Sequence, residues 1–138
     1  MRILALDHGT VRIGVAISDE LKMMAHPMDF IPAEPLPAAL DQVKALVLEK
    51  TVEQIVVGMP RNMDGSYGDS AARVREFVGV LKEAVGVPVR TWDERLTTVS
   101  AARALRQGGG KKSEYRQKID STSAAILLQG YLDSLPPG

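Results

Sequence analysis

The chain has 138 residues, of which 45% are hydrophobic and 25% are charged, values typical of one globular domain. It contains no cysteine, which excludes disulfides, thiolate metal sites and cysteine nucleophiles. The formal net charge is zero, so any contact with nucleic acid has to come from a local basic patch. The apolar runs are too short to span a bilayer, and together with the lack of cysteine this predicts a cytoplasmic protein without membrane contact.

Residues 2–19 predict a β-hairpin at the centre of a buried sheet. Two runs rich in Ile, Leu, Val and Ala, Ile3–Leu6 and Ile13–Ser18, are joined by a short polar turn. Side chains alternate along a strand, so Asp7 lies on the same face as Ala5. A carboxylate there either caps its own turn or is paired or bound to a metal, because burying an unpartnered charge is costly. The hairpin alone leaves these two interpretations equal.

The remaining elements alternate between strands and helices. A third strand is predicted at Met24–Ile31, at an edge of the sheet because Pro27 interrupts it. Later strands are expected at Gln54–Gly58 and Val87–Trp92. Helices are expected at 36–47, Asp69–Val85, Thr97–Gly108 and Asp120–Leu135. Loops are expected at Met59–Gly68 and Gly108–Lys118. This order predicts one α/β domain over residues 1–138.

Several polar residues converge on one edge of the predicted sheet. Helical crossovers make the strands that they join parallel, so the first, fourth and fifth strands should run in the same direction. Their carboxyl ends then share one edge, where open α/β sheets bind their ligands. Asp7, the Met59–Gly68 loop and Glu94 all reach this edge.

The last predicted helix adds a third acid. Asp120 falls on the same helical stripe as Ala124, Leu128 and Tyr131, so it faces the core side of the helix. An acid in a first turn can also simply complement the helix dipole. If Asp7, Glu94 and Asp120 meet, their mutual repulsion calls for a cation, and oxygen ligands suit Mg²⁺ or Mn²⁺. One or two such ions would support phosphodiester hydrolysis.

Basic residues are concentrated near the predicted acidic site. The segment from Arg90 to Lys118 is strongly basic and includes a glycine-rich stretch. A run of this kind is usually a solvated face, but beside an acidic site phosphate contact is at least as well supported. The candidates for contact with nucleic acid are Arg12, Arg61, Arg95, Lys111, Lys112, Arg116 and Lys118.

Four segments together resemble one known family. They are ALDHGTVRIGVAISD at 5–19, VVGMPRNMDGS at 56–66, WDERLTTVSA at 92–101 and IDSTSAAILLQGYLDS at 119–134. In this order and spacing the chain resembles the YqgF/RuvX-like family, described as Holliday junction resolvases and as nucleases of the 16S ribosomal RNA precursor. The resemblance implies a ribonuclease-H-like fold with a five-stranded mixed sheet flanked by helices. It also implies that Asp7, Glu94 and Asp120 are the catalytic, metal-binding acids.

The leading hypothesis is a divalent-metal-dependent endonuclease that acts on structured nucleic acid, with maturation of the 16S precursor at its 5′ end as the family role. One alternative is a DNA junction resolvase, which requires a dimer because two sites cut symmetrically. A second alternative is a processing factor that binds nucleic acid without cutting it. The opening D-x-G-T hairpin also suggests an actin-like ATPase, but those enzymes need two domains. The expected state is a monomer or a weak homodimer.

Overall fold

The computed structural model describes residues 1–9, 11–60, 68–93 and 122–135. Its strands are β1 (Arg2–His8), β2 (Arg12–Ser18), β3 (Ala25–Pro32), β4 (Val52–Met59) and β5 (Val89–Asp93). Its helices are α1 (Leu36–Glu49), α2 (Asp69–Ala84) and α5 (Thr122–Ser134). The predicted helix Thr97–Gly108 and the loop Gly108–Lys118 lie outside the described residues.

The strands form one five-stranded mixed sheet in the order β3-β2-β1-β4-β5. The pairs β1–β2 and β2–β3 are antiparallel, whereas β1–β4 and β4–β5 are parallel. The predicted hairpin, the edge position of β3 and the parallel set are therefore confirmed. The carboxyl ends of β1, β4 and β5 point to one edge of the sheet, as the helical crossovers require.

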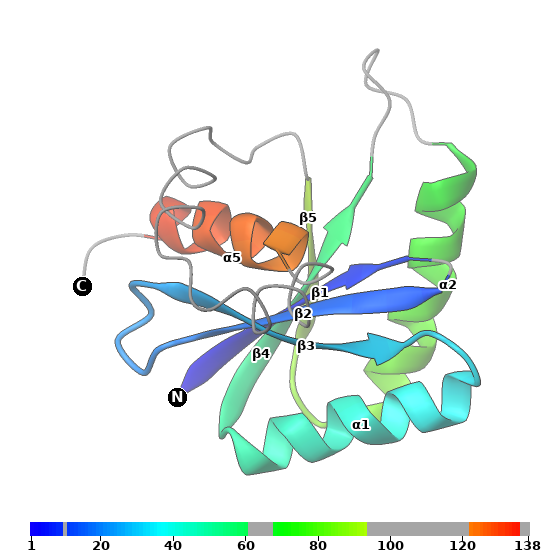
Figure 1. The fold of residues 1–138 in the computed structure, drawn as a ribbon, viewed down its shortest axis with the longest axis horizontal. Coiled ribbons are helices and arrows are strands. Elements are labelled where there is room, and N and C mark those ends of the chain that lie inside the picture. Colours follow the sequence, from blue (N-terminus) through cyan, green and yellow to red (C-terminus); the bar gives the residue numbers. More distant parts are fainter. Residues whose placement is uncertain (10, 61–67, 94–121, 136–138) are drawn as a thin grey trace.

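Helices cover both faces of the sheet (Figure 1). On one face, Leu4 and Leu6 of β1 join the core formed with α1 and α2. On the other face, Ile3 and Ala5 pack against the buried side of α5. This alternation follows from the two-residue period of a strand, and it places Asp7 on the α5 face.

Most element ends lie within two residues of the predicted ones, and the start of β5 differs for an identifiable reason. The strand expected from Val87 begins at Val89, because Pro88 has no N–H to donate to the neighbouring strand. Only the Pro88 carbonyl takes part, accepting a hydrogen bond from the Ile55 N–H at 2.9 Å. Leu36, the first residue of the predicted helix and of α1, is 37% exposed. The buried side of α1 is instead Ala39 and Val43.

Gln129 of α5 forms hydrogen bonds with the backbone at the start of the edge strand β3. Its Oε1 accepts a hydrogen bond from the Ala25 N–H at 3.0 Å, and its Nε2 donates to the Met23 carbonyl at 3.0 Å. The amide also donates to Asp133 Oδ1 at 3.0 Å. A buried polar side chain that satisfies two backbone groups in another element fixes the position of its helix.

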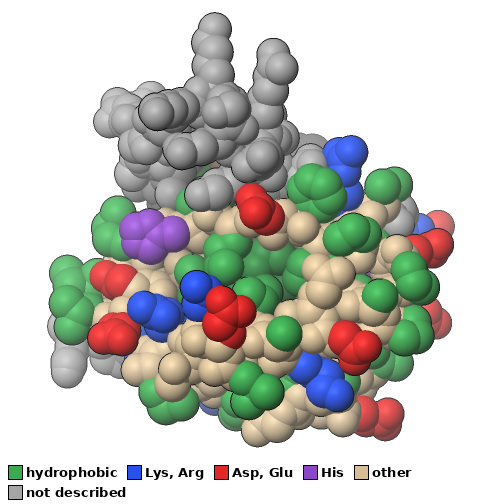
Figure 2. All heavy atoms as spheres, turned by 60° about the horizontal axis from the view of Figure 1, so that its bottom comes forward, with side chains coloured by type: hydrophobic (Ala, Val, Ile, Leu, Met, Phe, Trp, Pro, Cys, Tyr) green, Lys and Arg blue, Asp and Glu red, His purple; other side chains and the backbone are tan. Residues whose placement is uncertain are grey.

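The outer surface carries both signs of charge. Figure 2 shows acidic and basic side chains interspersed around hydrophobic ones on the face that it presents. Among the described residues, no helix is both long and apolar enough to cross a membrane.

Candidate functional site

Asp7 lies between two glycines of the neighbouring strands. It pairs with Gly14 of β2, and it follows Leu6, which pairs with Val57 of β4. The next residue of β4 is Gly58, which is buried like Gly14 and pairs with Trp92 of β5. Paired residues share a face of the sheet, so the half-buried Asp7 carboxylate is flanked by glycines on both neighbouring strands. Neither neighbouring strand therefore contributes a side chain directly beside the carboxylate.

The edge that Asp7 reaches is also where β4 and β5 end. Met59 and Asp93 pair at this end of the parallel ladder, and the next residue after Asp93 is Glu94. Glu94 lies outside the described residues, as does Asp120, which precedes the start of α5 by two residues. The strand that leads to Glu94 and the helix that follows Asp120 are thus in the predicted places. The meeting of the three acids stays a prediction.

The predicted apolar stripe of α5 is confirmed. Ala124, Leu127, Leu128 and Tyr131 are all buried against the sheet. The Tyr131 ring meets Trp92 edge to face with centroids 5.2 Å apart, and its hydroxyl donates to Gln54 Oε1 at 3.2 Å. The partly buried Trp92 therefore packs against the core on the α5 face. Within residues 1–9, 11–60, 68–93 and 122–135, no three His, Asp or Glu side chains form a cluster suited to a metal ion.

Arg12 is the one predicted nucleic-acid contact that falls among the described residues. It is exposed at the start of β2, near the end of β1, because the hairpin is antiparallel. Its guanidinium lies 5.0 Å from the centre of the Phe30 ring. The other six candidates, Arg61, Arg95, Lys111, Lys112, Arg116 and Lys118, lie outside the described residues.

Gly9 makes the tight turn after β1. Its N–H donates to the Arg12 carbonyl at 2.9 Å, and a Cβ at this position would lie 2.7 Å from the same oxygen. That separation is too short for two non-bonded atoms, so the turn requires glycine. The turn thereby holds Asp7 and Arg12 at the same edge of the sheet.

His8, which follows Asp7, points to the opposite face. Its ring stacks on Phe77 of α2, with centroids 4.5 Å apart and an interplanar angle of 24°. Burial lowers the pKa of His8 below its ordinary value of 6.5, and the positive charge of Arg73 lowers it further against the opposing effect of Asp7. Because its ring packs on the face opposite to the Asp7 carboxylate, His8 is a structural neighbour of the site.

The lowered pKa of His8 makes stability depend on pH. Between the folded pKa and 6.5 the unfolded chain binds more protons, so the free energy of unfolding should fall as the pH drops through this window. Urea titrations in EDTA at several pH values measure this slope. His8→Phe keeps a ring against Phe77 but cannot titrate, so it should flatten the slope. The same pH dependence of stability in wild type and His8→Phe would contradict the assignment of this dependence to His8.

Strand register reveals two site residues that sequence reasoning missed, Gly14 and Gly58. Each stands in an apolar strand where glycine is disfavoured, and this is the signal that the sequence offers. The signal becomes interpretable only when pairing places both glycines beside Asp7.

Comparison with known proteins gives a consistent result. The RuvX family model, described as "Holliday junction resolvase", matches residues 1–134. The chain is 44% identical over 133 residues to a protein of Halothermothrix orenii, covering 96% of this chain and 95% of that protein. It is 48% identical over 135 residues to a protein of Moorella thermoacetica, covering 98% and 96%. Both relatives are named "Putative pre-16S rRNA nuclease".

Two solved structures share the fold. Thermus thermophilus RuvC in complex with a Holliday junction substrate superposes with a TM-score of 0.61 at 17% identity, covering 99% of both chains. The fowlpox virus resolvase in complex with Holliday junction DNA also gives 0.61, at 11% identity, covering 99% of this chain and 100% of that one. The ribonuclease-H-like fold implied by the four sequence segments is confirmed.

Proposed function

We propose a substrate for this chain, which belongs to the RuvX family and is a nuclease. It hydrolyses phosphodiester bonds at the 5′ end of the precursor of 16S ribosomal RNA. The observation that carries the proposal is Asp7, a carboxylate between two glycine-bearing strands at the ligand-binding edge of the sheet. Relatives named for the same substrate match the chain nearly end to end. The proposed unit is a single cytoplasmic domain over residues 1–138.

The residues fit a divalent cation of the Mg²⁺ or Mn²⁺ type. Asp7 supplies carboxylate oxygens, the ligands that these ions prefer, and the glycines on the neighbouring strands contribute no competing side chain. Glu94 and Asp120 would complete the ligand set from the end of β5 and the start of α5. When bound, one or two ions would activate water and stabilise the leaving oxygen.

The chain's own residues have separate parts in this proposal. The sheet holds Asp7 rigidly, because Asp7 lies within a paired strand and not on a loop. Arg12, exposed at the same edge, would bind a substrate phosphate together with Arg61, Arg95, Lys111, Lys112, Arg116 and Lys118. Such contacts position nucleic acid without reading its sequence.

A junction-resolving activity on DNA is the second candidate, because the matching family model is described as "Holliday junction resolvase". Symmetric cutting of a four-way junction requires two active sites, and thus a dimer of this chain. A protein that stays monomeric when bound to a junction would rule this candidate out.

The test is cleavage of three labelled substrates: an RNA spanning the 5′ end of the 16S precursor, an unrelated single-stranded RNA and a four-way DNA junction. Each is incubated with Mg²⁺, with Mn²⁺ or with EDTA. We expect metal-dependent cutting of the precursor RNA at a discrete position and no cutting in EDTA. Preferential, symmetric cutting of the junction would favour the second candidate. Binding without cutting under every condition would contradict both and indicate a non-catalytic processing factor.

A further inference from the structure

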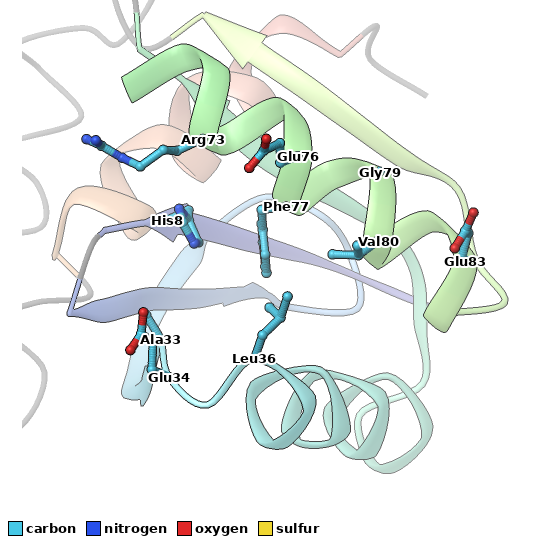
Figure 3. Close-up of a pocket in the computed structure, with 10 residues that line it drawn as sticks. All are labelled: His8, Ala33, Glu34, Leu36, Arg73, Glu76, Phe77, Gly79, Val80 and Glu83. Carbon is cyan, nitrogen blue, oxygen red and sulfur yellow. The ribbon is translucent and has the colours of Figure 1, made fainter. Parts of the chain in front are cut away.

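A groove of about 700 Å³ opens between α2 and the segment that leads into α1. It lies on the α1 and α2 face of the sheet, whereas Asp7 lies on the α5 face. Figure 3 shows Phe77 and Val80 of α2 and Leu36 of α1 pointing into the same space. The apolar part of the lining is Ala33, Leu36, Phe77, Gly79 and Val80.

The floor of the groove is preformed. Phe77 is only 3% exposed, and the His8 ring stacks on it. At the rim, Leu36 is 37% exposed because it stands at the first position of α1, beyond the packed residues Ala39 and Val43. A fixed apolar floor with an exposed leucine at its rim lowers the conformational cost of binding an apolar partner.

The rim of the groove is mainly acidic in the described part of the chain. Glu34, Glu76 and Glu83 line it with exposed carboxylates, and Arg73 is the basic residue among the lining side chains. An acidic rim repels the phosphates of a nucleic acid and attracts a cationic ligand. The charge therefore favours a basic protein segment over an RNA strand.

We propose that this groove docks a basic amphipathic segment of a partner protein. Residues 73–83 of α2 span about 15 Å, enough for two turns of a helix that offers apolar side chains at positions i, i+4 and i+7. Those side chains would cover Val80 and Leu36 above the buried Phe77, while flanking Lys or Arg residues would meet Glu34, Glu76 and Glu83. This surface is separate from the proposed cleavage site and does not depend on which nucleic acid is cut.

A probe peptide tests the proposal directly. A fluorescent helix of about 14 residues carries Leu at i, i+4 and i+7 with Lys and Arg elsewhere, and a second peptide has the same composition with the Leu spacing scrambled. Anisotropy titrations should show binding of the patterned peptide at least about tenfold tighter than the scrambled one. Glu76→Gln combined with Glu83→Gln should weaken binding about threefold or more and reduce its dependence on salt.

Gly79 offers a matched pair of variants. A Cβ there meets nothing within 4 Å, so Gly79→Ala should fold and bind as wild type, whereas Gly79→Trp should fill the groove and weaken binding at least about tenfold. Leu36→Lys, at an exposed position, gives a second block with opposite charge, so the test does not depend on the folding of Gly79→Trp. Equal affinity for both peptides, or full binding by Gly79→Trp and Leu36→Lys, would overturn the proposal. So would an oligouridine that displaces the patterned peptide, because the groove would then bind nucleic acid.

Discussion

Asp7→Asn is expected to reduce metal-dependent cleavage by at least about 100-fold while leaving the fold intact. Replacing even an indirect neighbour of a bound metal commonly costs 10–100-fold, and Asp7 is proposed to contact the ion itself. The substitution preserves the shape of the side chain, so the packing of β1 between β2 and β4 should not change. Single-turnover cleavage of the preferred substrate in Mg²⁺ and in Mn²⁺ measures the loss.

Asp29→Asn provides the matched control for that experiment. Asp29 is exposed on the edge strand β3, and its replacement makes the same chemical change away from the row that contains Asp7, Gly14 and Gly58. We expect wild-type cleavage from this control and equal thermal melting of both variants. Full activity in Asp7→Asn would show that the carboxylate is not part of the reacting site, and would remove the main support for the proposed function.

Local sequence patterns predicted most of the architecture because the signals in this chain agree with one another. Alternation in β1 fixed the face on which Asp7 lies, and Pro27 correctly marked β3 as an edge strand. The predicted helix Asp69–Val85 is observed as α2, and its apolar residues at helical spacing, from Val74 to Leu81, are buried. These features depend on neighbours in sequence, which is why they can be read without a structure.

The features that escaped prediction depend on pairing between distant segments. The glycines beside Asp7 acquire meaning only through the register of β2 and β4 against β1. The groove lies between α2 and the segment that leads into α1, which are distant in sequence, so local patterns do not reveal that Leu36 lies at its rim. In the sequence, Gln129 is one polar residue among apolar ones. Its role depends on the fold, which places it in contact with the start of β3.

Those contacts lead to a second large expected effect, on stability. Gln129→Leu should lower the free energy of unfolding by about 1–3 kcal/mol, because it leaves the buried Ala25 N–H without its partner, whereas water can replace the bond to the exposed Met23. With a typical urea dependence this shifts the unfolding midpoint down by about 2 M or less. Urea titration followed by circular dichroism measures the shift, and hydrogen exchange at the Ala25 amide should accelerate.

Asp133→Ala is the appropriate comparison for Gln129→Leu. It removes the third hydrogen bond of the same side chain, but Asp133 is exposed and water can replace it, so a change within about 0.5 kcal/mol is expected. Equal stabilities of Gln129→Leu and wild type would mean that apolar packing alone holds α5 against β3. A large loss of stability in Gln129→Leu, without one in Asp133→Ala, would show that the two backbone contacts of Gln129 hold α5 against the sheet. These contacts would then fix the helix that follows Asp120 on the same face as Asp7.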